Sequence, residues 1–166
     1  METTILDEAV AEFEGTLRGS LLRPGDEGYD EARTVWNATV DKRPALVVQC
    51  GGPADVISAV EFAADRDIPI SVKGGGHNIA GRAVGEDALM VDVSPRSAVR
   101  VEPDERTARV EPGVVLNELD HETQAFGLAT PVGYNSTTGV AGLTLGGGWG
   151  WLSRKHGLTV DNLVSA

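Results

Sequence analysis

The spacing of hydrophobic residues predicts helices and strands in alternation over the first half of the chain. Apolar residues at helical spacing predict an amphipathic helix over residues 5–18, preceded at 4–7 by a sequence that resembles a capping box. The apolar run 45–49 predicts a buried strand, and a helical pattern at 56–63 leads to a second strand at 68–72. A strand, a helix and a strand in this order form a β-α-β unit with parallel strands and a right-handed crossover.

The second half of the chain has shorter apolar runs separated by turn residues. The elements expected outside the β-α-β unit are strands at 88–93, 98–102 and 107–111, a helix at 114–126 closed by Gly127, and an irregular or short helical passage at 29–37. The last six residues, 161–166, are expected to begin another strand. We interpret this ending as a truncated domain.

Composition and charge narrow the classes of function. The 14 basic and 25 acidic residues give a formal net charge of −11. A chain this acidic is repelled by phosphate backbones and anionic lipid, so we expect neither a nucleic acid nor a membrane as partner. Cys50 is the only cysteine, which leaves no intrachain disulfide and no cysteine zinc site. The sequence has no signal-peptide pattern and no apolar run of membrane-spanning length, so we expect a cytoplasmic protein.

Three adjacent glycines, Gly74, Gly75 and Gly76, follow the second predicted strand and precede His77. Because glycine has no side chain to pack and loses the most backbone entropy, this stretch predicts a hinge from strand to loop. With no Cβ atoms in the way, consecutive N–H groups can form a concavity that favours an anion such as a pyrophosphate. An imidazole at its rim can serve as a general base, a metal ligand or a covalent tether. The alternative is a glycine-rich turn with a surface histidine.

The common phosphate-binding motifs do not fit this loop. The dinucleotide motif G-x-G-x-x-G needs a third glycine where Ile79 stands. The P-loop needs a lysine and a hydroxyl residue where Arg82 and Ala83 stand. The three histidines are too far apart in sequence for a local metal motif, so we expect no metal site, and we interpret His121 and His156 as solvated structural residues.

A second concentration of glycine, interleaved with Thr and Ser, follows residue 131. Its members are Gly133, Gly139, Gly142, Gly146, Gly147, Gly148 and Gly150. Two glycine-rich loops in a β-rich frame suit a long ligand with a diphosphate at its centre, whereas a mononucleotide needs only one such loop. The alternative is that the second cluster lets small-residue helices pack closely.

The residues from about Tyr29 to the end resemble a known family. The specific part is Lys73-Gly74-Gly75-Gly76-His77-Asn78 followed by the sequence GVAGLTLGGGWG at 139–150. The chain resembles the FAD-binding domain of the FAD-linked oxidases of the vanillyl-alcohol oxidase and PCMH type, most closely the berberine-bridge-enzyme-like branch. The resemblance implies an α+β fold of the PCMH type, with a βαβ unit, a mixed or antiparallel sheet and flanking helices.

The resemblance also implies roles for individual residues. The implied cofactor-binding residues are Lys73, Gly74, Gly75, Gly76, His77, Asn78 and Gly81 around the first loop, and Gly133, Thr137, Thr138, Gly139, Gly142, Gly147 and Gly148 in the second. The backbone of the first loop would cradle the FAD pyrophosphate. His77 matches the histidine that bonds covalently to the 8α carbon of the isoalloxazine.

Two departures from the family pattern limit these expectations. Bicovalent members carry a cysteine two residues after the glycine that Gly133 matches, and here that residue is Asn135. We therefore expect at most one covalent link, through His77. Family members continue into a substrate domain that supplies the catalytic base, so we assign no catalytic residue. We expect an N-terminal helix and lead-in at 1–28 and an incomplete FAD-binding domain at 29–166.

The predicted function is that of the FAD-binding part of an oxidoreductase that takes a hydride from an alcohol, sugar or amine. Two alternatives stay open. One is a flavin reductase of the same fold that holds FAD without a covalent link, against which His77 argues. The other is a truncated remnant that neither binds flavin tightly nor catalyses. The partner expected is a small-molecule substrate, and the sequence does not choose the substrate, the electron acceptor or the oligomeric state.

Overall fold

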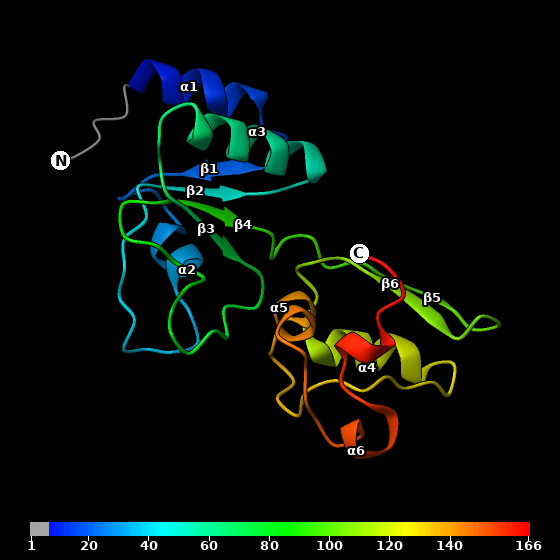
Figure 1. Ribbon diagram of the computed structural model, residues 1–166. Coiled ribbons are helices and arrows are strands. Elements are labelled where there is room, and N and C mark those ends of the chain that lie inside the picture. The colour runs from blue at the N-terminus through cyan, green and yellow to red at the C-terminus, as the bar shows by residue number, and fades with distance from the viewer. Residues whose placement is uncertain (1–6) are drawn as a thin grey trace. The chain divides into compact units, whose positions relative to one another are not determined.

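The chain divides into two compact units. The computed structural model describes residues 7–166. The first unit contains residues 7–73 and 78–95, and the second contains residues 74–77 and 96–166 (Figure 1). Residues 4–6 of the proposed capping box lie outside the described part of the chain.

The first unit is a four-stranded mixed sheet with three helices. Its elements are α1 Asp7–Thr16, β1 Ser20–Leu22, α2 Tyr29–Arg33, β2 Leu46–Gln49, α3 Pro53–Ala64, β3 Ile70–Lys73 and β4 Leu89–Asp92. The strand order is β1-β2-β4-β3, in which β1 is antiparallel to β2 while β4 is parallel to both β2 and β3. The parallel strands of the predicted β-α-β unit are confirmed, but β4 lies between them.

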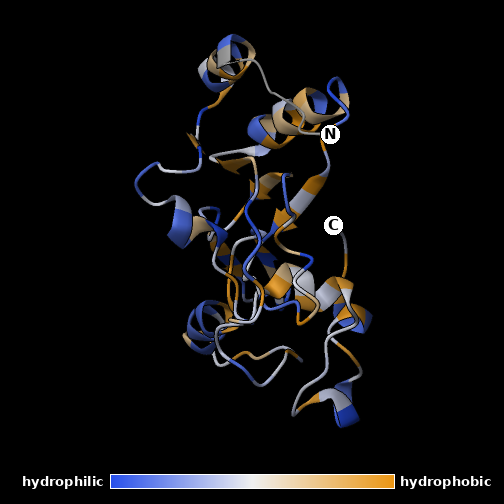
Figure 2. Cartoon of the chain, turned by 90° about the vertical axis from the view of Figure 1, so that its left-hand side faces the viewer, coloured by the Kyte–Doolittle hydropathy of each residue, from blue (hydrophilic) through white to orange (hydrophobic). Residues whose placement is uncertain are grey.

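The two central strands of this sheet, β2 and β4, are buried on both faces. Val48 and Val91 pack with α1 and α3 on one face, and Val47 and Met90 pack with Tyr29 of α2 on the other. Figure 1 shows α1 and α3 side by side on one face, and Figure 2 shows hydrophobic colour along the strands. Strands that are apolar on both faces explain why β2 and β4 read as continuous hydrophobic runs rather than alternating ones.

Asp55 joins the end of α1 to the start of α3. Its carboxylate accepts backbone N–H groups from Arg18 and Gly19 at 2.9 Å and from Gly51 at 2.7 Å. Burial on its own raises the pKa of the Asp55 carboxyl, but these N–H donors favour the anion more, and the pKa is lowered overall. The ionised carboxylate therefore fixes where the chain enters β1.

The second unit is an antiparallel hairpin with short helices. Its elements are β5 Val99–Glu102, β6 Thr107–Val110, α4 Leu116–Gln124, α5 Val140–Leu145, α6 Ser153–His156 and the 3-10 helix η1 Val160–Asn162. Val114, Leu116, Leu119 and Val132 form its buried core. Gly127 closes α4 as predicted, with a φ of 67° and an N–H donated to the carbonyl of Gln124. The predicted α+β class is confirmed.

The helices described in the structure are short. The longest is α3, with 12 residues, and none within residues 7–166 is both long and apolar enough to cross a membrane. Helix α5 lies in the glycine-rich second half, where the hydrophobic pattern predicted no helix range.

The prediction of a strand at the end of the chain is wrong. Val160–Asn162 is a 3-10 helix, and residues 163–166 have no regular structure. The carboxylate of Asp161 accepts the N–H of Leu158, and the Asn162 amide donates to the carbonyls of His156 and Leu158. These side-chain bonds fold the backbone into a turn, which competes with extended structure.

Candidate functional site

The glycine loop of the second unit packs by its backbone against the start of α5. A Cβ atom at Gly75 would lie 2.6 Å from the Cα of Gly139, and a Cβ at Gly139 would lie 2.6 Å from the nitrogen of Gly75. A Cβ at Gly74 would lie 3.0 Å from the carbonyl oxygen of Pro112. Gly76 has a φ of 68°, which side chains rarely allow. Two segments far apart in sequence thus meet without side chains, as a backbone cradle requires.

His77 lies at the end of this loop, half-buried against the turn before α5. Its Nε2 lies 2.9 Å from the hydroxyl oxygen of Thr137, and its Nδ1 lies 3.5 Å from that of Thr138. Burial lowers the pKa of the His77 imidazole below its usual value near 6.5. The ring is therefore neutral at neutral pH, which is the form that can act as a nucleophile or a base.

Asn135 orders the turn that carries Thr137. Its Oδ1 accepts the backbone N–H of Thr137 at 3.2 Å and the Thr137 hydroxyl at 3.0 Å. The sequence identified Asn135 only as the position where a cysteine is missing, and this bonding role was not predicted. The signal was present, because an Asn followed two residues later by Thr is typical of a side-chain-stabilised turn.

Some glycines of the second cluster allow neighbouring segments to pack closely, whereas another faces open space. A Cβ at Gly133 would meet leucine methyl groups at 2.9 and 3.3 Å, and Gly148, with a φ of 72°, lies against the hydroxyl of Thr159. That hydroxyl is buried and has no hydrogen-bond partner in the described part of the chain. Gly147 has a φ of 101°, whereas a Cβ at Gly142 would point into open space. Close packing explains Gly133 and Gly148 but not Gly142.

Three predicted residues, Lys73, Asn78 and Gly81, belong to the first unit. The ammonium of Lys73 donates to the carbonyl of Ala32 and lies 4.0 Å from the Asp92 carboxylate. Both interactions lie within the first unit. Gly81 has a φ of 67° and donates its N–H to the carbonyl of Asn78 at 2.9 Å. The predicted role of the Lys73 backbone in binding a cofactor stays a prediction.

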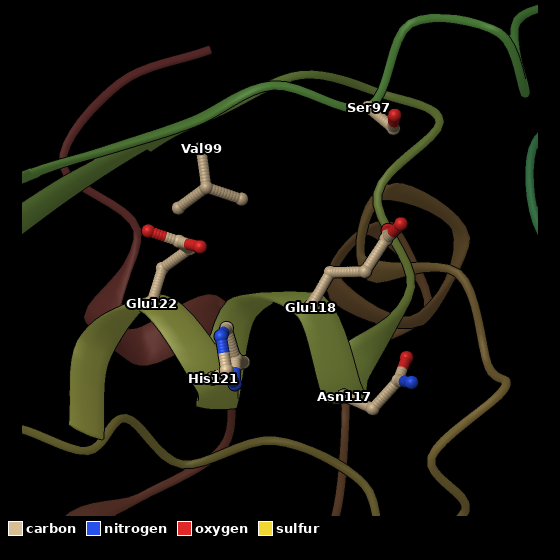
Figure 3. A pocket seen from close by; sticks show the side chains of 6 residues that line it. All are labelled: Ser97, Val99, Asn117, Glu118, His121 and Glu122. Atoms are coloured by element: carbon tan, nitrogen blue, oxygen red, sulfur yellow. The ribbon is translucent and has the colours of Figure 1, made fainter. Parts of the chain in front are cut away.

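Two hollows on the second unit lie outside the predicted glycine loop. The smaller, of about 600 Å³, is lined by Ser97, Val99, Asn117, Glu118, His121 and Glu122 (Figure 3). Its Glu118 carboxylate accepts the N–H of Val115 at 2.8 Å and so caps α4. No group of three or more His, Cys, Asp or Glu residues within 7–166 is placed to hold a metal ion. The larger, of about 1080 Å³, lies between the β5–β6 hairpin, α5 and the chain end and includes Thr159.

Comparison with known proteins gives consistent matches over most of the chain. The family described as "FAD binding domain" matches residues 44–166. The chain is 33% identical over 151 residues to (R)-6-hydroxynicotine oxidase of Paenarthrobacter nicotinovorans, covering 91% of this chain and 33% of that protein. It is 34% identical over 147 residues to glucooligosaccharide oxidase of Sarocladium strictum, covering 84% of this chain and 28% of that protein.

Solved structures give the same result. The structure of BBE-like 1 from Physcomitrella patens matches with a TM-score of 0.84 and 31% identity, covering 95% of this chain and 34% of that one. The chain spans about a third of the length of these relatives.

Proposed function

Because the chain belongs to the FAD-binding domain family, we propose that it forms the flavin-binding part of an oxidoreductase and holds FAD through a covalent bond from His77. The resemblance inferred from the sequence is confirmed, since the matches include an FAD-linked oxidoreductase of Dictyostelium discoideum and BBE-like 1 of Physcomitrella patens. The covalent bond and the whole reaction are our proposal.

The observation that carries the proposal is the position of His77. It follows directly after a loop with no side chains, and its imidazole is kept neutral by burial. The backbones of Gly75 and Gly139 are close enough to exclude any side chain between them, and the Thr159 hydroxyl is a buried polar atom beside Gly148. These features fit a long phosphate-bearing cofactor, which the backbone would hold and the imidazole would anchor.

FAD supplies the redox chemistry when bound, by accepting a hydride from a substrate C–H bond. The residues of this chain bind and orient it, and we assign no catalytic base among them. The names of the relatives, a hydroxynicotine oxidase and a glucooligosaccharide oxidase, support an amine, alcohol or sugar as the substrate class. We propose a small-molecule partner and a cytoplasmic location, and the net charge of −11 supports the absence of nucleic-acid and membrane partners.

The decisive experiment looks for flavin that survives denaturation. The chain, and the longer reading frame if its gene continues past Ala166, is expressed and run on a denaturing gel, and the protein band is examined for flavin fluorescence. We expect a fluorescent band from the wild type and from His121→Ala, and none from His77→Ala. His121 is a matched control because it is exposed in the same unit.

The same gel separates the alternatives. A yellow preparation whose band is not fluorescent indicates non-covalent FAD and favours the reductase of the same fold. A colourless protein supports the remnant. Fluorescence that persists in His77→Ala shows that another residue carries the bond.

A further inference from the structure

The outer edge of strand β5 is complementary to itself. We propose that this edge pairs with the same edge of a second copy of the chain, so that the two-stranded sheets of two copies join into one antiparallel sheet. The contact is independent of any flavin, because it depends on the hydrogen bonds, the strand register and the charges of the hairpin β5–β6 in the second unit (Figure 1).

The register of the hairpin shows which backbone groups of β5 face away from β6. Glu111 donates its N–H to the carbonyl of Ala98, the residue before β5, and the two strands continue in the same register. In an antiparallel pair, residues that exchange hydrogen bonds alternate with residues that do not. Counting from Ala98, Arg100 and Glu102 bond to β6, and the residues between them point their N–H and C=O groups away from it.

Val99 and Val101 therefore carry the unpaired edge of this sheet. Within residues 7–166, no hydrogen bond from outside the hairpin reaches the backbone N–H or C=O of either residue. Both residues are only partly buried. An exposed edge of this kind is a template for another strand, and a two-stranded ribbon gains stability when further strands join it.

The charges beside this edge select a second copy as the partner. Arg100 and Glu102 lie on the same face of β5, with the Arg100 Nε 2.7 Å from the Glu102 carboxylate and with side chains that are 79% and 45% exposed. When two copies of β5 run antiparallel with Val101 opposite the same residue of the other copy, Arg100 of each copy lies opposite Glu102 of the other. The contact then contains two opposite-charge pairs.

The same charges exclude the neighbouring registers. Centring the contact one residue earlier places Arg100 opposite Arg100, and centring it one residue later places Glu102 opposite Glu102. Like charges directly opposite each other on two strands are destabilising. The register centred on Val101 is therefore the one that this strand favours.

The backbone agrees with this register. The outward N–H and C=O groups of Val101 in the two copies bond to each other, so the facing Arg100 and Glu102 form a pair without mutual hydrogen bonds, in which the side chains approach most closely. The apolar side of the hairpin stays on one side of the joined sheet, because Val99 packs against the core of the second unit. A contact between identical surfaces closes with two copies, so association through β5 stops at the dimer.

Sedimentation equilibrium of the 166-residue chain, up to millimolar concentration, measures this association. Physiological ionic strength is used because it screens the net charge of −11 on each copy. We expect a reversible equilibrium between the 17.4 kDa chain and its dimer. Val101→Pro removes an outward N–H but no bond to β6, and proline is tolerated at the outer side of an edge strand. This variant should keep the wild-type circular dichroism spectrum and stay monomeric.

Charge reversal tests the register. Arg100→Glu alone and Glu102→Arg alone each place like charges opposite one another across the contact, so each variant should sediment as a monomer. In an equal mixture, the two acidic side chains of one variant face the two basic side chains of the other. The dimer should therefore return in the mixture.

Arg100→Gln and Arg109→Gln form a matched pair of variants. The two arginines lie directly opposite each other across the hairpin. Each substitution removes one positive charge and relieves the same repulsion within the hairpin, but only Arg100 faces the second copy. Because two opposite-charge pairs are lost, Arg100→Gln should raise the dissociation constant of the dimer about 2–30-fold. Arg109→Gln should leave it unchanged.

The outcomes decide the proposal. A chain that stays monomeric at every concentration overturns it and leaves the β5 edge to a different partner. A dimer that persists in Val101→Pro, or that Arg109→Gln weakens as much as Arg100→Gln, is formed by another surface and also overturns it. A dimer that returns only when Arg100→Glu is mixed with Glu102→Arg establishes both the surface and the register.

Discussion

Alanine at Gly139 and alanine at Gly142 should change stability in opposite directions, although the two residues are three positions apart at the start of α5. At Gly139 the new Cβ would lie 2.6 Å from the nitrogen of Gly75 and 3.0 Å from its Cα. Neither atom belongs to a flexible side chain, so the two backbones must separate by about 0.8 Å to reach the 3.4 Å of an ordinary contact. Overpacking of this kind costs about 1–3 kcal/mol.

At Gly142 the Cβ meets nothing within 4 Å, and the residue is exposed in the interior of α5 with an ordinary helical φ. Alanine there removes only the entropic cost of glycine in a helix, so Gly142→Ala should raise the free energy of unfolding by about 0.5–1 kcal/mol. The assay is urea unfolding of the flavin-free chain followed by circular dichroism.

The same pair tests the flavin site. If the open space at Gly142 holds the cofactor, Gly142→Ala should stabilise the flavin-free chain and still reduce covalent incorporation of FAD. Gly139→Ala should reduce both, because it displaces the loop that carries His77. Equal stability of the two variants would refute the backbone contact between the loop and α5, and undiminished flavin incorporation in Gly142→Ala would remove Gly142 from the cofactor site.

Three further predictions concern single side chains. Asp55→Asn should lower the free energy of unfolding by about 3 kcal/mol, because an amide cannot accept all the N–H groups that the carboxylate accepts. Because the pKa of Asp55 is lowered in the folded state, its contribution is full above the ordinary pKa near 3.8 and is lost as the pH falls through the folded value, and urea unfolding at several pH values should show this loss only in the wild type. Tyr29→Phe removes a buried 2.6 Å bond to the carbonyl of Pro44 and should cost about 1–3 kcal/mol by the same assay. An NMR titration of His77 should give a midpoint below 6.5, and its contribution to stability should decline as the pH falls from 6.5 through that midpoint; a midpoint above 6.5 would contradict the burial of the ring.

Local patterns were enough to predict most of the elements. Periodicity identified β2, β4, α3 and α4 because each depends on apolar side chains spaced for one face or on a run buried on both. The glycine loop was recognisable for a similar reason, since glycines at 74–76 exclude a strand interior whatever surrounds them. The strand predicted for 161–166 failed because the side chains of Asp161 and Asn162 bond to nearby backbone groups.

The candidate site was likewise predictable from the sequence only in part. The motif around His77 and the glycines at 139–150 identified the family from the sequence alone, because a loop that binds a ligand by its backbone requires glycine at particular positions. Its atomic contacts depended on the fold. Nothing in the order of residues places Gly75 against Gly139, or the Thr137 hydroxyl between Asn135 and His77.

The sequence by itself thus determined most of the helices and strands and the family, and it singled out His77 as the residue proposed to anchor a flavin, because these depend on local spacing and on which positions can lack a side chain. The tertiary structure decided the insertion of β4 between β2 and β3, the contact of the two glycine segments and the hydrogen bonds that orient the His77 ring. These features join residues far apart in the chain, and their geometry exists only once packing has brought the backbones together.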